Sequence, residues 1–146
     1  MFQFEIFSPL AAQKQTRWTK DGHAYDPSKK DKERIQWQIR PTAPAVPLSQ
    51  PVELTIIFFF KVPKSASRLL RAQMLNRVIL PDKKPDADNL AYLVSNALKE
   101  LVYDDDKRVC AEHIYKFYGP EEKTVIRVRP ILQAEPLGLR DVDDII

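Results

Sequence analysis

The sequence has very little cysteine, glycine or histidine, and each shortage excludes a class of site. Cys110 is the only cysteine among 146 residues, so no disulfide can form within the chain and a zinc–thiolate centre is not expected. The three glycines stand apart at positions 22, 119 and 138, which excludes a glycine-rich phosphate loop. Of the two histidines, His23 and His113, neither is assigned a catalytic role, and His113 is interpreted as structural.

Long hydrophobic runs are also missing. The longest strongly apolar run, residues 56–60, is far too short to span a bilayer. The first ten residues lack the basic and apolar regions of a signal peptide, so we expect a cytoplasmic protein with no membrane partner. The net charge of +3 suits a polyanionic partner, but it suits an ordinary basic domain equally well.

What is present is the pattern of one α+β domain. Alternation and β-branched content predict strands at 2–7, 52–62, 108–118 and 123–129, with the last two joined as a hairpin through Gly119-Pro120. Helices are expected from Asp26-Pro27 to residue 40, at about 64–78, and from Asp88 onward. We therefore predict a small mixed β-sheet of about four strands with helices packed on it.

Three further segments frame this domain. The four prolines of residues 41–51 indicate an extended surface loop. Asp21-Gly22 predicts a hairpin turn whose arms carry Arg17-Trp18 and Ala24-Tyr25, where Trp18 either packs or stacks on an unpaired base. The domain is expected to cover residues 1–130. Residues 131–146 form a tail that is either flexible or docks on a partner.

The helix that follows Asp88 has two distinct faces. Its apolar residues recur at steps of three and four, which predicts one buried stripe: Leu90, Leu93, Val94, Ala97, Leu98, Leu101 and Val102. The opposite, accessible face carries Asp88, Tyr92, Asn96 and Lys99. Carboxylates and a lysine would thus share the open face of a basic domain.

Acidic residues flank this helix on both sides. Asp86 and Asp88 precede it, and Asp104, Asp105 and Asp106 follow it. These side chains have a simple structural interpretation as a helix cap and a polar turn. They are also the hard oxygen ligands that Mg²⁺ prefers, and an Asp-x-Asp pair lets two carboxylates converge on one ion. Such an ion would neutralise charge and orient water during phosphodiester hydrolysis.

At these residues the chain resembles the RusA-like Holliday-junction resolvases. The resemblance is carried by Lys84-Pro85-Asp86-Ala87-Asp88-Asn89-Leu90, by Asn96-Ala97-Leu98, and by Asp105-Asp106-Lys107-Arg108-Val109. It implies a homodimeric, magnesium-dependent endodeoxyribonuclease that cuts branched DNA in recombination and repair, with Mn²⁺ as an alternative ion. It also implies that Asp86, Asp88 and Asp106 are catalytic and bind the metal, with Asp105 as a neighbouring ligand.

The chain departs from the family pattern at two positions. Tyr92 stands where the family often has lysine, and Asn96 stands where it often has aspartate. Lys83, Lys84 or Lys99 is a candidate substitute for that lysine. The alternative of a catalytically weak or inactive branched-DNA-binding protein therefore stays open, as does a protein-interaction domain whose aspartates are only caps and turns.

Basic residues near the acidic ones are the expected phosphate contacts. These residues are Lys14, Arg17, Lys83, Lys84, Lys99, Lys107 and Arg108. Asp88 and Asp106 lie on opposite sides of a helix of about 14 residues, roughly 21 Å long. Two such helices packed antiparallel about a two-fold axis would bring them together. We therefore predict a homodimer that pairs through this helix, with a composite site.

Overall fold

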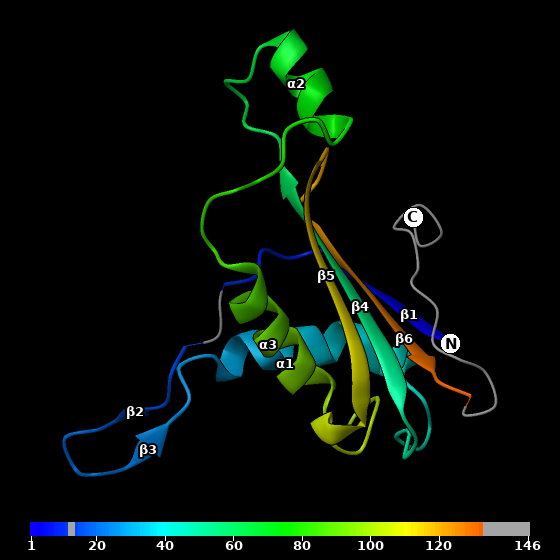
Figure 1. Cartoon of the computed structure of the whole chain (residues 1–146). Coiled ribbons are helices and arrows are strands. Elements are labelled where there is room, and N and C mark those ends of the chain that lie inside the picture. Colours follow the sequence, from blue (N-terminus) through cyan, green and yellow to red (C-terminus); the bar gives the residue numbers. More distant parts are fainter. Residues whose placement is uncertain (12–13, 133–146) are drawn as a thin grey trace.

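A four-stranded mixed sheet forms the centre of the computed structural model, which describes residues 1–11 and 14–132. The strands are β1 (Phe2–Ile6), β4 (Val52–Lys61), β5 (Val109–Gly119) and β6 (Lys123–Pro130). Their order is β1-β6-β4-β5, with β4 parallel to β5 and the other two pairings antiparallel (Figure 1). The expected α+β class and the small mixed sheet are confirmed.

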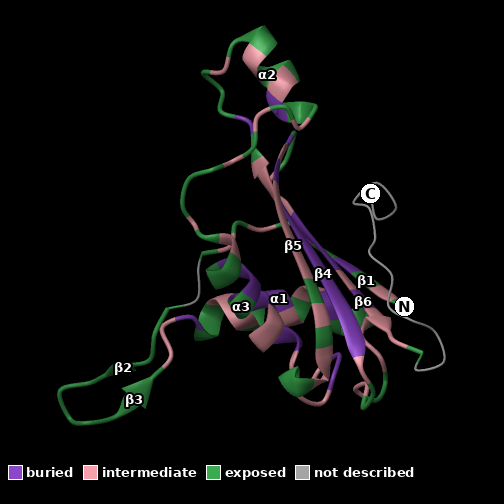
Figure 2. Cartoon of the chain, in the orientation of Figure 1, coloured by how far each residue is buried: buried purple, intermediate pink, exposed green. Residues whose placement is uncertain are grey.

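The most apolar segment lies inside the sheet, as its sequence indicated. Residues 52–58 are buried without interruption, because β4 has a neighbour on each edge and side chains over both faces (Figure 2). A parallel pair needs a long crossover connection. Here the chain between β4 and β5 supplies two helices, α2 (Arg68–Leu75) and α3 (Ala87–Leu98).

The predicted hairpin between the last two strands is wrong. Both strands exist, but β4 lies between them, and residues 120–122 carry the chain across its end. The Gly-Pro turn signal predicted a reversal of direction, which does occur. It does not determine whether the two strands are neighbours, and the apolar β4 buries most surface by occupying that place. Gly119 suits this crossing, since a Cβ there would lie 3.2 Å from Phe59 Cδ1.

Two helices cover one face of the sheet and complete the main core. α1 (Lys29–Ile39) and α3 pack on each other, and Gln36 Nε2 donates to the carbonyl of Ala97 at 3.2 Å. The expected stripe of α3 is buried as far as Leu98, where the helix ends. Leu101 and Val102 belong to the turn beyond, with Val102 fully buried.

Several boundaries differ from expectation by a few residues. α1 begins after Ser28, whose backbone N–H donates to Asp26 Oδ1 at 2.9 Å, and a 3₁₀ turn (Arg40–Thr42) follows it. α2 is much shorter than 64–78, because Ser67 caps its start by accepting from Leu70 N at 3.1 Å. Arg77, with a φ of 62°, turns the chain away after its end.

Two elements project from the body. One is the predicted hairpin of β2 (Arg17–Trp18) and β3 (Ala24–Tyr25), and the other carries α2 (Figure 1). The hairpin extends to the lower left in Figure 1, and the segment with α2 extends beyond the end of β4 and β5 at the top. Among the described residues, no helix has the length and apolar character needed to cross a membrane. Apart from residues 131 and 132, the predicted tail lies outside the described residues, so the domain boundary stays a prediction.

A buried ion cluster joins three strands on the other face of the sheet. Glu53 of β4 is 3% exposed, and its Oε2 accepts from Arg129 Nε of β6 at 2.6 Å. Its Oε1 lies 3.0 Å from His113 Nε2 of β5, so His113 has a structural contact. Sequence reasoning missed Glu53, because only the register of three strands brings these side chains together.

Candidate functional site

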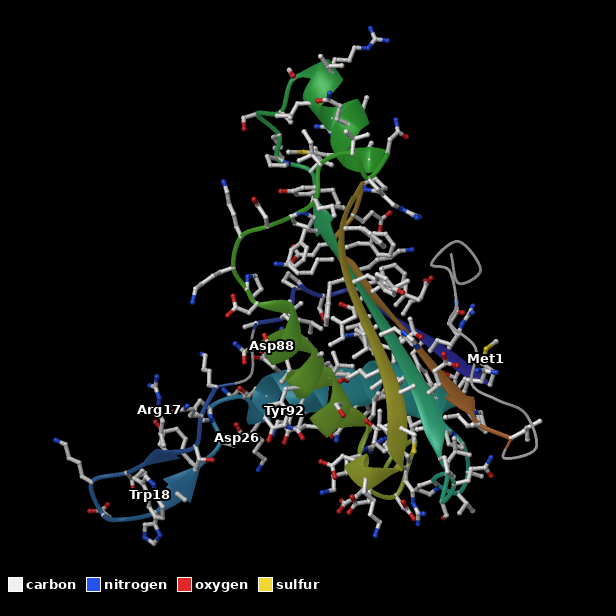
Figure 3. The ribbon with its side chains drawn as sticks, in the orientation of Figure 1. Met1, Arg17, Trp18, Asp26, Asp88 and Tyr92 are labelled. Carbon is white, nitrogen blue, oxygen red and sulfur yellow. The ribbon has the colours of Figure 1, made fainter. Side chains whose placement is uncertain are left out.

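The first aspartate pair lies at the amino end of α3 and faces solvent (Figure 3). Asp86 occupies the N-cap position, yet its side chain makes no capping hydrogen bond. Asp88 is in the first turn, and its Oδ1 accepts from the adjacent Asn89 N at 2.9 Å. Helix capping therefore explains one carboxylate oxygen of Asp88, and it does not explain the carboxylate of Asp86.

The second acidic group lies at the opposite end of α3, and two of its members have structural roles. Asp104 accepts both ends of the Arg108 guanidinium fork at 2.7 and 2.9 Å, which lowers the pKa of its carboxyl. Asp105 caps the short 3₁₀ turn (Asp106–Arg108) by accepting from Lys107 N at 2.9 Å, and this bond lowers the pKa of Asp105.

Asp106 is the most available of the three. It is exposed, its carboxylate oxygen lies 4.0 Å from Lys99 Nζ, and the side chain of Asp105 lies beside it. Lys99 directly follows the last residue of α3. Asp106 therefore lies at the carboxyl end of the helix, next to a cation.

The two acidic groups are well separated within one chain. Asp88 and Leu98 are ten positions apart on α3, about 15 Å along its axis. Within residues 1–11 and 14–132, no three His, Cys, Asp or Glu side chains are placed so that they could hold one metal ion. Between the two ends, the predicted open face is present: Tyr92 is 58% exposed, and Asn96 and Lys99 are half-buried.

Tyr103 sets the position of the second acidic group relative to the helix. Its side chain is fully buried, and its hydroxyl lies 2.9 Å from Ser95 Oγ and donates to the Ser95 carbonyl at 3.0 Å. Burial raises the pKa of Tyr103 to about 12. Asp104 N also donates to the Leu48 carbonyl at 3.0 Å, so the proline-rich loop supports the same turn.

The predicted phosphate contacts fall into two groups. The side chains of five are exposed: Lys14, Arg17, Lys83, Lys84 and Lys107. Lys99 and Arg108 are half-buried and already face Asp106 and Asp104. Lys83 and Lys84 directly precede Asp86, Lys14 and Arg17 lie before and on the projecting hairpin, and Lys107 belongs to the 3₁₀ turn beyond the other end of α3.

Both tryptophans lie on the surface of the described residues, so of the two alternatives for Trp18 the structure does not support packing. Trp18 is 71% exposed on the hairpin, and Trp37 is 73% exposed on α1 with the Arg40 guanidinium 5.7 Å from its ring. A tryptophan on a basic hairpin offers a flat apolar surface to a base.

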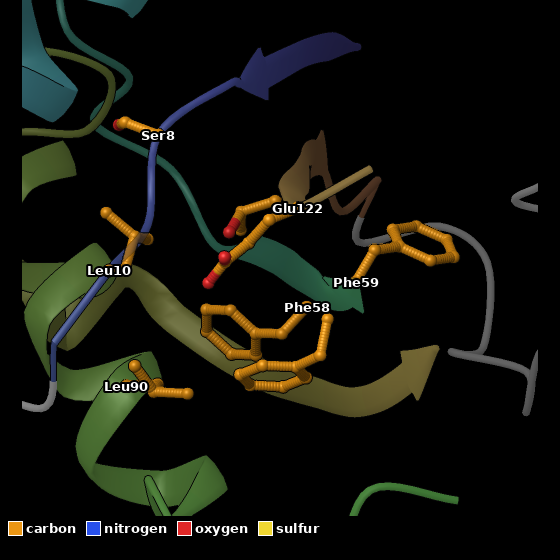
Figure 4. A pocket seen from close by; sticks show the side chains of 8 residues that line it. Ser8, Leu10, Phe58, Phe59, Leu90 and Glu122 are labelled. Atoms are coloured by element: carbon orange, nitrogen blue, oxygen red, sulfur yellow. The ribbon is translucent and has the colours of Figure 1, made fainter. Parts of the chain in front are cut away.

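The hollow beside the amino end of α3 is not a metal site. It lies between residues 8–10 and the end of β4, and Figure 4 shows phenylalanines and leucines around most of it. Glu122 is the single carboxylate among its lining residues, which are Ser8, Leu10, Phe58, Phe59, Phe60, Leu90, Glu122 and Thr124. One carboxylate among rings suits packing better than ion binding.

Comparison with known proteins agrees with a nuclease arrangement. The family described as Endodeoxyribonuclease RusA matches residues 7–129, and the chain belongs to this family. The family acts on branched DNA, and its nucleases generally depend on divalent metal ions. The chain is also 26% identical over 136 residues to the uncharacterised protein YqaN of Bacillus subtilis (strain 168), covering 88% of this chain and 96% of that protein.

Proposed function

We propose that the protein is a magnesium-dependent endonuclease that resolves four-way DNA junctions by hydrolysing phosphodiester bonds. The observation that carries this proposal is the exposed Asp86 carboxylate, which a helix cap would have used and which here is left facing solvent beside Asp88. Family membership supports the reaction class.

The donor set fits a hard divalent cation. Asp86, Asp88 and Asp106 offer exposed carboxylate oxygens, and Mg²⁺ commonly takes one or two protein carboxylates together with water and phosphate. Mn²⁺ shares this oxygen preference. Bound there, the ion would neutralise phosphate charge and lower the pKa of an attacking water. Asp105 would act as a neighbour that is already engaged with the 3₁₀ turn.

The site is composite, formed by two chains. Because about 15 Å of helix separates the two acidic ends in one chain, a second α3 packed antiparallel would place the Asp106 end of one copy at the Asp88 end of the other. Tyr92 supports this pairing, since a 58% exposed aromatic lies four residues after Asp88, between the two acidic ends of the exposed face. Two symmetric sites would suit paired cuts in a two-fold symmetric junction.

Lys99 is the best substitute for the cation that Tyr92 replaces. Its ammonium group lies 4.0 Å from Asp106, so it would enter the composite site together with that residue. There it would attract the scissile phosphate and stabilise negative charge that builds during hydrolysis. Lys83 and Lys84 precede Asp86 and would position the DNA backbone.

A second candidate function is a branched-DNA-binding protein with weak or no cleavage. The observation that favours it is Tyr92, which puts a neutral side chain on the exposed face of α3 one turn after Asp88. Such a protein would keep the phosphate contacts and the exposed Trp18 for binding. Cleavage of a labelled four-way junction with and without Mg²⁺ separates the two functions.

Asp88→Asn tests the role of the pair, with Asp82→Asn as the matched control. Asp82 is another exposed aspartate six residues upstream. We expect Asp88→Asn to lower the cleavage rate at least about 100-fold, roughly 3 kcal/mol, because an amide neutralises a metal ion poorly. Junction affinity without metal should stay equal or rise, because a repelling charge is gone. Equal cleavage by both variants would remove Asp88 from the metal site.

A further inference from the structure

The segment between β4 and α3 forms a projection with a strongly one-sided charge. Residues 61–81 contain five cations, Lys61, Lys64, Arg68, Arg71 and Arg77, and no aspartate or glutamate. The whole chain carries +3, so the other residues sum to −2 (+3 minus +5). The net positive charge of the chain therefore comes from one short segment, which stands out from the body (Figure 1).

The projection is anchored by one arginine and presents the others. The Arg77 guanidinium lies 4.8 Å from the ring centroid of Phe117 on β5, and Met74 is 8% exposed on the inner side of α2. Arg68 and Arg71 are exposed and one turn apart, so their side chains are neighbours on the surface of α2. Among the described residues, Lys64, Arg68 and Arg71 have no side-chain hydrogen bond or ion pair.

This charged surface leads directly to the candidate site. After the projection the chain passes Lys83 and Lys84 and reaches Asp86 and Asp88 at the start of α3 (Figure 3). Lys116 Nζ of β5 donates to the Lys83 carbonyl at 2.7 Å, which ties this connection to the sheet. The cations of α2 and those next to the aspartates therefore lie on one continuous stretch of chain, which has a contact to the sheet at Lys83.

We propose that residues 61–81 bind the phosphate backbone of a duplex arm that leaves the cleavage site. This assignment rests on the proposed function and adds a surface to it. α2 is about 12 Å long, which equals three to four base pairs of duplex. Arg68 and Arg71 contact neighbouring phosphates, so the surface adds affinity without sequence preference.

A second copy of the chain is the less suitable occupant of this surface. Leu69 is 70% exposed and Leu75 is 40% exposed on α2, and they supply some apolar area. Pairing two identical projections would, however, bring five positive charges against five with no acidic residue between them. A polyanion removes that repulsion.

The test compares Arg68→Gln/Arg71→Gln with a control of equal charge change, Arg34→Gln/Arg40→Gln, whose arginines are exposed on and just after α1. Binding to a four-way junction is measured by fluorescence anisotropy without metal, from 50 to 200 mM KCl. Two lost phosphate contacts should lower the salt slope by about 1.8, so the wild-type advantage over the α2 variant shrinks about twelvefold across this range. The control should keep the wild-type slope.

Cleavage then separates binding from chemistry. With the α2 variant we expect KM to rise and kcat to stay unchanged, because these arginines touch the arm and not the reacting phosphate. If wild type binds and cuts junctions but the α2 variant keeps its slope, this surface assignment is wrong while the proposed function stands. A wild type that neither binds nor cuts overturns the proposed function itself. A variant that changes only the sedimentation coefficient would identify a chain–chain interface and refute the assignment.

Discussion

Replacing Tyr103 with phenylalanine tests how the Asp104–Asp106 turn is held to α3. Tyr103→Phe keeps the buried ring and removes a hydroxyl that contacts Ser95 Oγ at 2.9 Å and the Ser95 carbonyl at 3.0 Å. A net hydrogen bond contributes about 1 kcal/mol, so the two contacts together should contribute roughly 1–2 kcal/mol at pH 7. The variant should be less stable than wild type by that amount.

The difference should disappear at high pH. Burial raises the pKa of Tyr103 to about 12 in the folded state, against about 10 when unfolded. The stabilisation is therefore complete below pH 10 and is lost as the pH rises toward 12, at about 1.4 kcal/mol per pH unit. Because the phenylalanine variant lacks this titration, the two proteins should become equally stable near pH 11.

Urea unfolding measures this difference directly, with both proteins at the same concentration so that any dimerisation affects them alike. The other tyrosines titrate in both proteins and cancel from the comparison. A stability difference that stays constant from pH 7 to pH 11.5 would refute the account of Tyr103. So would a variant as stable as wild type at pH 7.

Two further substitutions test the two faces of the sheet. Arg129→Gln should destabilise the fold by about 2–3 kcal/mol, because it leaves the buried Glu53 carboxylate without its arginine. This is somewhat less than for a fully buried pair, since Arg129 is partly exposed. A loss of stability under about 0.5 kcal/mol in urea unfolding would contradict the structural role of the Glu53 cluster. Leu93→Ala should cost about 3 kcal/mol through the cavity it leaves under α3, against less than 0.5 kcal/mol for the control Leu69→Ala on the exposed side of α2. Equal melting temperatures for these two variants would place Leu93 outside the core.

Local sequence patterns predicted the helices and strands well, but they did not predict which strands lie next to each other. The alternation of residues 2–7, the apolar run of β4 and the stripe from Leu90 to Leu98 each depend on a period that burial imposes, and each was found. The order of the sheet was not accessible, because a turn after Gly119 reverses the chain without fixing which strand it meets. The late start of α2 depends on the cap at Ser67, which competes with a longer periodic pattern.

The sequence allowed the residues of the candidate site to be predicted, but not the contacts and distances between them. The Asp-x-Asp motif pointed to Asp86 and Asp88, and the structure leaves both exposed. Sequence spacing could not show that Asp104 forms an ion pair with Arg108, since the 3₁₀ turn brings the two side chains together. The positive charge of residues 61–81 is visible in the sequence as a stretch without acidic residues. Its interpretation as a binding surface depends on the projection of this segment from the body, which only the structure shows.

Mixing two inactive variants tests the composite metal site most directly. Asp88→Asn and Asp106→Asn are each expected to abolish junction cleavage in Mg²⁺. A dimer of one chain of each kind contains one site with both substitutions and one site with neither. The composite site therefore predicts that unfolding and refolding the two variants together restores about a quarter of the wild-type sites. A mixture in which both chains fold and dimerise yet no cleavage returns would contradict it, because a site built within one chain always keeps one substitution.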